Sequence, residues 1–203
     1  MTQIEELSKA RSRVYLDEEA AFVLYRGELR SFQVRQGEDL EQESYEAIMT
    51  QVLPRRAKQR AMHLLKNRDY TVKQLRDKLK EGGYPDRVIQ EALDYVGSYR
   101  YTDDLRYALG FISSHAESRS RRRLEQDLLG RGIERETLEK AWEQWEEQGG
   151  NQDEEAMIRE LLEKKHFDPQ RADQRERQRV YAFLMRKGFS GELVRRAVLS
   201  DIF

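Results

Sequence analysis

Three related segments recur along this 203-residue chain, and they constrain its fold more than any other feature of the sequence. The segments read LKEGGYPDRVIQEAL (79–93), LLGRGIERETLEKAW (128–142) and LMRKGFSGELVRRAV (184–198). Each carries a glycine, Gly83, Gly132 or Gly188, with a leucine four positions before it and an apolar residue directly after it. The glycines are 49 and 56 residues apart, and this period indicates an array of small repeated structural units.

Around each glycine, apolar residues recur at the spacing of two amphipathic helices. They lie four and eight positions before the glycine, and six, nine and ten positions after it. Glycine suits the left-handed backbone conformation in which many helices end, and the apolar residue after it can pack back on the helix. A further amphipathic segment precedes each pair, so the pattern predicts three-helix units at residues 51–100, 101–150 and 151–203.

Polar residues ahead of the apolar stretches predict where several helices begin. Thr71 followed by Gln74 is a capping box, in which two side chains bind free backbone N–H groups of the first turn. Thr102 or Asp103 is expected to cap the first helix of the second unit. In the third unit, Asp168 before Pro169 predicts the start of a middle helix several residues longer than its counterparts.

The N-terminal segment, residues 1–50, follows the shorter period of β-structure. Its β-branched and aromatic runs predict a small hairpin or three-stranded sheet, with strands at 13–16, 21–25 and 29–35 and a turn at Gly27. The stretch DLEQESYEAIMTQVL then predicts a helix that leads into the first unit. Because so small a sheet is unstable alone, we expect it to lean on the first unit or to serve as a contact element.

Composition favours helix and points away from several functional classes. No apolar run approaches the roughly 20 residues of a membrane helix, and no signal peptide is evident, so we expect a cytoplasmic protein without membrane contact. The chain has no cysteine, and its histidines, His63, His115 and His166, are isolated from other ligand residues. Phosphate-binding glycine loops and hydrolase motifs are absent from the sequence. We therefore expect no enzyme activity, no metal and no cofactor.

Basic residues are concentrated in blocks that could meet an acidic partner. Residues 51–100 hold 12 Lys and Arg against 6 Asp and Glu, whereas residues 1–50 hold 6 against 11. Guanidinium groups bind phosphate and carboxylate by paired, charge-assisted hydrogen bonds. The equally weighted alternative is a solvated helix face, on which Arg119 to Arg123 pair with Glu117, Glu125 and Asp127. The candidate contact residues are Lys73, Arg76, Lys80, Arg119, Arg121, Arg122, Arg123, Arg186, Lys187, Arg195 and Arg196.

Taken together, these motifs resemble the RecX family of recombination regulators. The resemblance covers roughly residues 55–203 and rests on the three ordered repeats and on YRYTDDLRYALGFI, with Tyr101, Asp103, Asp104 and Tyr107 as its pattern. One departure is ESRSRRRLEQ (117–126), where many members have Gly-Pro before the middle helix of the second unit. The family pattern does not indicate which direction the basic side chains of this segment face.

The resemblance implies a mainly α fold, an elongated and curved array of three tandem three-helix repeats. It also implies a partner, the RecA–single-stranded DNA filament, whose ATP hydrolysis, strand exchange and co-protease activity such proteins restrain in recombination, DNA repair and the SOS response. We expect a monomer. Whether the protein caps filament ends, blocks the groove or promotes disassembly stays open.

Two other functions remain compatible with the residues. Three-helix units resemble helix-turn-helix folds that bind DNA directly. The acidic ERETLEKAWEQWEEQ (134–148) would be repelled by phosphate, although Arg195 and Arg196 leave weak DNA contact open. A helical scaffold for another protein is the third possibility. Asp103 and Asp104 are expected to cap a helix rather than bind metal, because adjacent helical residues point about 100° apart.

Overall fold

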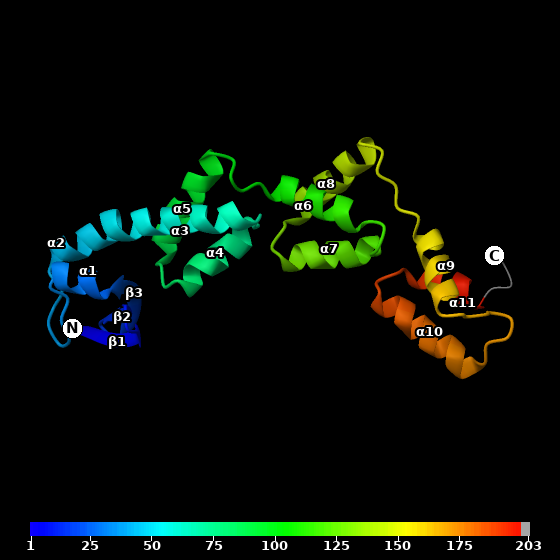
Figure 1. The fold of residues 1–203 in the computed structure, drawn as a ribbon, viewed down its shortest axis with the longest axis horizontal. Helices are drawn as coiled ribbons and strands as arrows, with labels where there is room; N and C mark the ends of the chain where they lie inside the picture. Colours follow the sequence, from blue (N-terminus) through cyan, green and yellow to red (C-terminus); the bar gives the residue numbers. More distant parts are fainter. Residues whose placement is uncertain (200–203) are drawn as a thin grey trace. The chain divides into compact units, whose positions relative to one another are not determined.

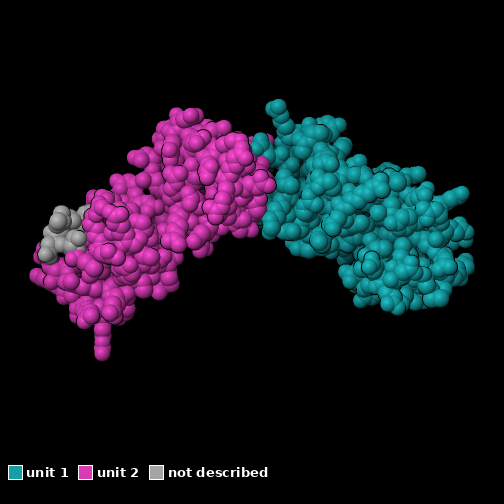
Figure 2. Space-filling model, turned by 180° about the vertical axis from the view of Figure 1, so that it is seen from behind, with its two compact units in different colours: residues 1–103 teal, residues 104–203 magenta. Residues whose placement is uncertain are grey.

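The computed structural model describes residues 1–199 (Figure 1), so residues 200–203 of the predicted third unit lie outside the described part. The chain divides into two compact units, Met1–Asp103 and Asp104–Phe203, which Figure 2 shows in different colours. Within the described residues, none of the helices is both long and apolar enough to span a membrane.

The first unit opens with an antiparallel sheet in the order β1-β2-β3. Its strands are β1 (Thr2–Ser8), β2 (Arg11–Leu16) and β3 (Glu19–Tyr25). The strands predicted at 13–16 and 21–25 therefore correspond to β2 and β3, and a three-stranded sheet is confirmed. The predicted strand at 29–35 is wrong, because that stretch begins inside the short helix α1 (Arg26–Ser31), and β1 was missed.

Local backbone conformation and burial explain why these predictions differ from the structure. The tight turn is formed by Asp17 and Glu18, whose φ angles are +50° and +68°, and not by Gly27. After β3, the Glu28 carboxylate accepts a hydrogen bond from the Tyr25 N–H at 2.7 Å, and this bond starts α1. In β1 only Thr2 is buried, so its sequence lacks the apolar alternation that identifies a strand.

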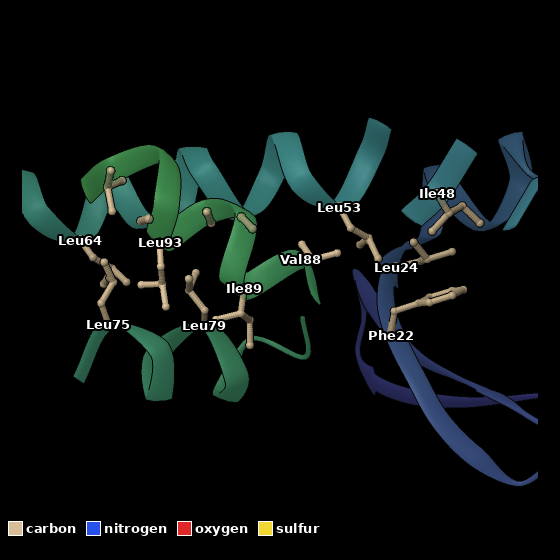
Figure 3. Close-up of a cluster of buried hydrophobic side chains, with 14 of the residues drawn as sticks. Phe22, Leu24, Ile48, Leu53, Leu64, Leu75, Leu79, Val88, Ile89 and Leu93 are labelled. Carbon is tan, nitrogen blue, oxygen red and sulfur yellow. The ribbon is translucent and has the colours of Figure 1, made fainter. Parts of the chain in front are cut away.

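Repeat 1 follows the sheet and shares one core with it. A helical run of α2 (Gln42–Ala47), the π-helical turn η1 (Ile48–Val52) and α3 (Leu53–Asn67) leads to α4 (Val72–Glu81) and α5 (Asp86–Ser98). Phe22 and Leu24 of β3 lie beside Ile48 and Leu53 in this core (Figure 3). The expectation that the sheet packs against the first three-helix repeat is confirmed.

The second unit contains the other two repeats, each with its own core. Repeat 2 comprises α6 (Asp104–His115), α7 (Arg121–Gly130) and α8 (Arg135–Glu147). Repeat 3 comprises α9 (Glu154–Lys164), α10 (Gln174–Arg186) and α11 (Gly191–Leu199). The predicted three-helix pattern is thus confirmed in all three repeats, and Trp142 is buried at its repeat position.

The repeat glycines end the middle helices as expected. Gly83, Gly132 and Gly188 have φ angles of +79°, +88° and +91°. After α7, the Ile133 N–H donates to the Leu128 carbonyl at 3.1 Å and the Gly132 N–H to the Leu129 carbonyl at 2.9 Å. This pair of bonds satisfies carbonyls that a helix end leaves free.

The predicted start of the long third-repeat helix at Pro169 is wrong. Residues 168–172 form a separate turn, in which the Ala172 N–H donates to the Asp168 carbonyl at 2.9 Å. The Arg177 guanidinium holds this turn by donating to the Pro169 carbonyl at 2.8 Å. Asp173 then caps α10, since its side chain accepts from the Glu176 N–H at 2.7 Å. By contrast, the predicted capping box of Thr71 and Gln74 is confirmed.

Repeats 2 and 3 are joined at the glycine that follows α10. The buried Ser120 hydroxyl, which caps α7, donates to the Lys187 carbonyl at 2.8 Å. A Cβ added at Gly188 would lie only 2.6 Å from this hydroxyl oxygen. In repeat 1 the equivalent Gly83 faces Val23 of β3, and an added Cβ would lie 2.2 Å from its Cγ2. The glycine after the middle helix is therefore covered by the sheet in repeat 1 and by repeat 2 in repeat 3.

We predict that Gly83→Ala destabilises the first unit by about 3 kcal/mol, because it combines an unfavourable positive φ with overpacking against Val23. Gly97→Ala is the control, since Gly97 is helical and its nearest neighbour would lie 4.0 Å from the added Cβ. That control is expected to stabilise by up to about 1 kcal/mol. Chemical denaturation measures both changes, and equal effects would contradict the assigned contact.

Ser120→Ala is expected to destabilise the second unit by about 2–3 kcal/mol, because it removes a helix cap and leaves the Lys187 carbonyl without its donor. Ser190→Ala is the matched control, since that exposed hydroxyl only accepts from the Leu193 N–H within repeat 3. We expect the control to lose about 1 kcal/mol or less. Equal losses in urea unfolding would show that Ser120 acts only as a local cap.

Candidate partner-binding surface

The candidate basic residues differ in how far their charge is neutralised within the chain. On α4, the Lys73 ammonium lies 3.5 Å from Asp77, and Lys80 lies 3.9 Å from Asp86. Arg76 donates to the Gln90 side-chain oxygen at 2.6 Å. The α4 residues are thus turned toward neighbouring polar side chains, and two of the three have a nearby carboxylate.

The arginine cluster of repeat 2 is neutralised more completely. Arg119 and Arg123 both bind the Asp127 carboxylate, at 2.9 and 3.1 Å. Arg121 lies 3.0 Å from Glu146 and its guanidinium stands 4.5 Å from the centre of the Trp142 ring. Only Arg122 is exposed without an ion pair within residues 1–199. The alternative of intramolecular pairing therefore describes most of this cluster.

Repeat 3 presents a group of cations that no carboxylate of the described chain neutralises. Arg175, Arg179 and Arg186 are exposed along one side of α10, and none has an ion pair among residues 1–199. They border a shallow hollow of about 810 Å³ that also contains Lys165 and Phe183. Among residues 1–199, no carboxylate lines this hollow. We call it the α10 basic face, made of Lys165, Arg175, Arg179, Phe183 and Arg186.

The aromatic ring at the centre of this face is bracketed by two lysines. The Lys165 ammonium lies 4.2 Å from the centre of the Phe183 ring, and the Lys187 ammonium lies 5.3 Å from it. Phe183 is partly exposed beside them. A flat ring among cations is typical of surfaces that contact phosphate backbones and stacked bases, although it suits acidic side chains as well.

Sequence reasoning identified only the end of the α10 basic face. Arg186 and Lys187 were candidates, whereas Lys165, Arg175 and Arg179 were not. The available signal was the spacing of four and seven residues from Arg175 to Arg179 to Arg186, which places all three on one helix face.

The α11 candidates are placed differently from each other. Arg195 is exposed and has no ion pair within the described chain. Arg196 lies 2.7 Å from the Glu155 carboxylate and 3.4 Å from Glu192. Of this pair, Arg195 is therefore the residue whose charge is available to a partner.

The aromatic and acidic motif residues are structural in their contacts. The Tyr107 hydroxyl accepts a hydrogen bond from Arg131, and Tyr101 stacks on Tyr99 with ring centres 5.7 Å apart. Asp104 lies in the first turn of α6, where a carboxylate interacts favourably with the helix dipole. Residues 1–199 contain no group of three His, Asp or Glu side chains placed to hold a metal ion.

Comparison with known proteins places all three repeats in one family. Models of the first, second and third three-helix domains of RecX match residues 57–95, 103–141 and 153–198. A regulatory protein RecX of Caldanaerobacter subterraneus subsp. tengcongensis is 31% identical over 96% of this chain and 95% of its own length. Another, from Trichlorobacter lovleyi, is 34% identical over 67% of this chain and 89% of its own length.

Solved structures support the same fold. A crystal structure of a regulatory protein RecX aligns with a TM-score of 0.59 at 23% identity, covering 98% of both chains. That of RecX from Lactobacillus salivarius aligns with a TM-score of 0.56 at 17% identity, covering 72% of this chain and 95% of the other. The chain belongs to the RecX family of regulatory proteins, which modulate RecA and are not enzymes.

Proposed function

We propose that this chain binds the RecA–single-stranded DNA filament and restrains ATP hydrolysis, strand exchange and co-protease activity by RecA. The observation that carries this proposal is the set of three consecutive RecX repeats, with an unneutralised basic face on the last. Such a regulator works where RecA works, in the cytoplasm, and a monomer suffices for it. Its partner surface is expected to be acidic, either phosphate or carboxylate.

The repeats suit a partner that is itself repetitive. Each repeat has a separate core, and the joint at Ser120 fixes repeat 3 against repeat 2. Contacts made by linked units add through high effective concentration, so each contact can be weak while the whole chain binds tightly. A filament offers the same surface at regular intervals, which allows several repeats to be engaged at once.

Within the partner surface, we assign the main role to the α10 basic face, joined by Arg122 and Arg195. Their charges need no intramolecular pair to be broken. The candidates Lys73, Lys80, Arg119, Arg121 and Arg123 can contribute only by exchanging a carboxylate of this chain for one of the partner. Exposed pairs of this kind contribute at most about 1 kcal/mol, so the exchange costs little.

Direct DNA binding is the second candidate function, and the α10 basic face is the observation that favours it. A phosphate backbone would meet several cations and an aromatic ring there. Against a helix-turn-helix mode, α8 exposes acidic residues such as Glu136, Glu139 and Glu143. We therefore expect contact with DNA to be weak, salt-sensitive and independent of base sequence.

Replacing Arg175, Arg179 and Arg186 by glutamine is expected to weaken binding to a bare dT oligomer. It should reduce the slope of log K against log salt concentration by about 2, because each lost phosphate contact on single strands removes about 0.7. The control replaces Arg87, Lys140 and Lys164 by glutamine, since each is exposed and paired with a carboxylate. Fluorescence anisotropy at several salt concentrations measures both slopes, and equal changes would refute the surface assignment.

The same two triple variants test the proposed partner. With RecA from the same source assembled on single-stranded DNA, we expect the α10 variant to bind the filament at least tenfold more weakly than the unmodified chain. The paired-charge control should bind within about threefold of it. Co-sedimentation with the filament gives these affinities, and an α10 variant that binds normally would exclude this face from the interaction.

A further inference from the structure

A second basic cleft lies in the first unit, between the sheet and repeat 1. It encloses about 560 Å³ and collects residues from β2, β3, α3 and α4. Its charged residues include Arg11, Arg56, Arg60 and Lys78, and Glu81 supplies the only carboxylate that lines it in the described part of the chain. We refer to it as the sheet–helix cleft.

Arg56 forms the fixed wall of the cleft. Its guanidinium donates to the Glu28 carboxylate at 2.8 Å and to the Val23 carbonyl at 3.3 Å. It also stands 4.2 Å from the centre of the Tyr25 ring. These contacts join α3 to β3 and α1, so the Arg56 charge is used to hold the sheet in place.

Arg11 and Arg60 are not used in this way. Both are exposed, both line the cleft, and neither guanidinium group has an ion pair or hydrogen bond within residues 1–199. Lys78 is already engaged, since its ammonium lies 2.7 Å from Glu81 at the same cleft. Two guanidinium groups from different elements therefore face one space in which the lining carboxylate, Glu81, is paired with Lys78, and that arrangement favours a bound anion.

Tyrosines supply the remaining chemistry of the cleft. Tyr25, Tyr70 and Tyr84 line it, together with the apolar side chain of Leu64. Burial raises the pKa of the Tyr84 hydroxyl, an effect that Arg56 partly offsets, so this group remains a neutral donor at pH 7. The cleft thus offers cations, hydroxyl donors and ring faces in a volume typical of small-molecule sites.

We propose that the sheet–helix cleft binds a phosphorylated nucleoside, with Arg11 and Arg60 contacting the phosphate. A phosphate group alone would leave much of the cleft empty, whereas a base and sugar would also meet the exposed ring of Tyr25. The ligand is either a free nucleotide or the terminal phosphate of a DNA strand. The site shares no residue with the α10 basic face, so the two proposals can be tested independently of each other.

Isothermal titration of the full-length protein tests this proposal with four probes. They are ADP, inorganic phosphate, and a dT trimer with and without a 5′-phosphate. We expect ADP or the phosphorylated trimer to bind at least tenfold more tightly than inorganic phosphate or the unphosphorylated trimer. The tighter of the first two identifies the source of the ligand.

The matched variants are Arg11→Gln with Arg60→Gln, and Arg30→Gln with Arg55→Gln. Arg30 and Arg55 are also exposed and unpaired within the described chain, and they do not line the cleft. The first pair should weaken binding of the preferred probe about tenfold or more, since each removes a charge-assisted hydrogen bond. The second pair should leave it unchanged, and circular dichroism checks that both variants are folded.

Three results would overturn the proposal. One is the absence of heat of binding for ADP and for the phosphorylated trimer at millimolar concentration. Another is that neither ADP nor the phosphorylated trimer binds more tightly than the unphosphorylated trimer, which would indicate general attraction to a polyanion. The third is an equal loss of affinity in both double variants, because the cleft arginines would then have no special role.

Discussion

The close approach of a neighbouring element to the glycine that ends a middle helix is the contact on which this structure depends. A side chain at Gly83 would collide with Val23 of the sheet, and one at Gly188 would collide with Ser120 of repeat 2. A three-helix unit of about 45 residues buries too little apolar surface to be stable without further packing. Packing at these glycines lets each small core gain a neighbour, which is how repeat proteins reach stability.

In an array of small cores, most charged side chains lie on the surface. Many of the basic ones form ion pairs there with carboxylates of the same chain. The arginine cluster before α7 is the clearest case, because Asp127 alone binds both Arg119 and Arg123. The α10 basic face differs, since uncharged side chains, Phe183 among them, separate its cations. For a modulator of RecA, we propose that this unneutralised face attracts the partner while the remaining repeats position the chain on it.

The helical part of the fold could be predicted from sequence because its signals are local. Glycine after an apolar helix, and Thr71 with Gln74, act through neighbouring backbone groups, and both predictions are confirmed. The strand predicted at 29–35 failed because Glu28 bonds back to the Tyr25 N–H and starts a helix there. The predicted start of α10 failed because the chain forms a separate turn at residues 168–172, and Asp173 caps the helix after it. Charge availability could be predicted only in part. Pairing of Arg119 and Arg123 with Asp127 was one of two alternatives from the sequence, whereas tertiary pairs such as Arg121 with Glu146, 25 residues apart, had no local signal.

The most direct test is the rate of ATP hydrolysis by RecA on single-stranded DNA as this protein is titrated in, with RecA from the same source. Binding to bare DNA at two salt concentrations is measured in parallel. A filament regulator should inhibit hydrolysis at well below one copy per RecA, while its binding to bare DNA stays weak and falls steeply with salt. Unchanged hydrolysis together with tight, sequence-dependent binding to duplex DNA would contradict the account and favour direct DNA recognition.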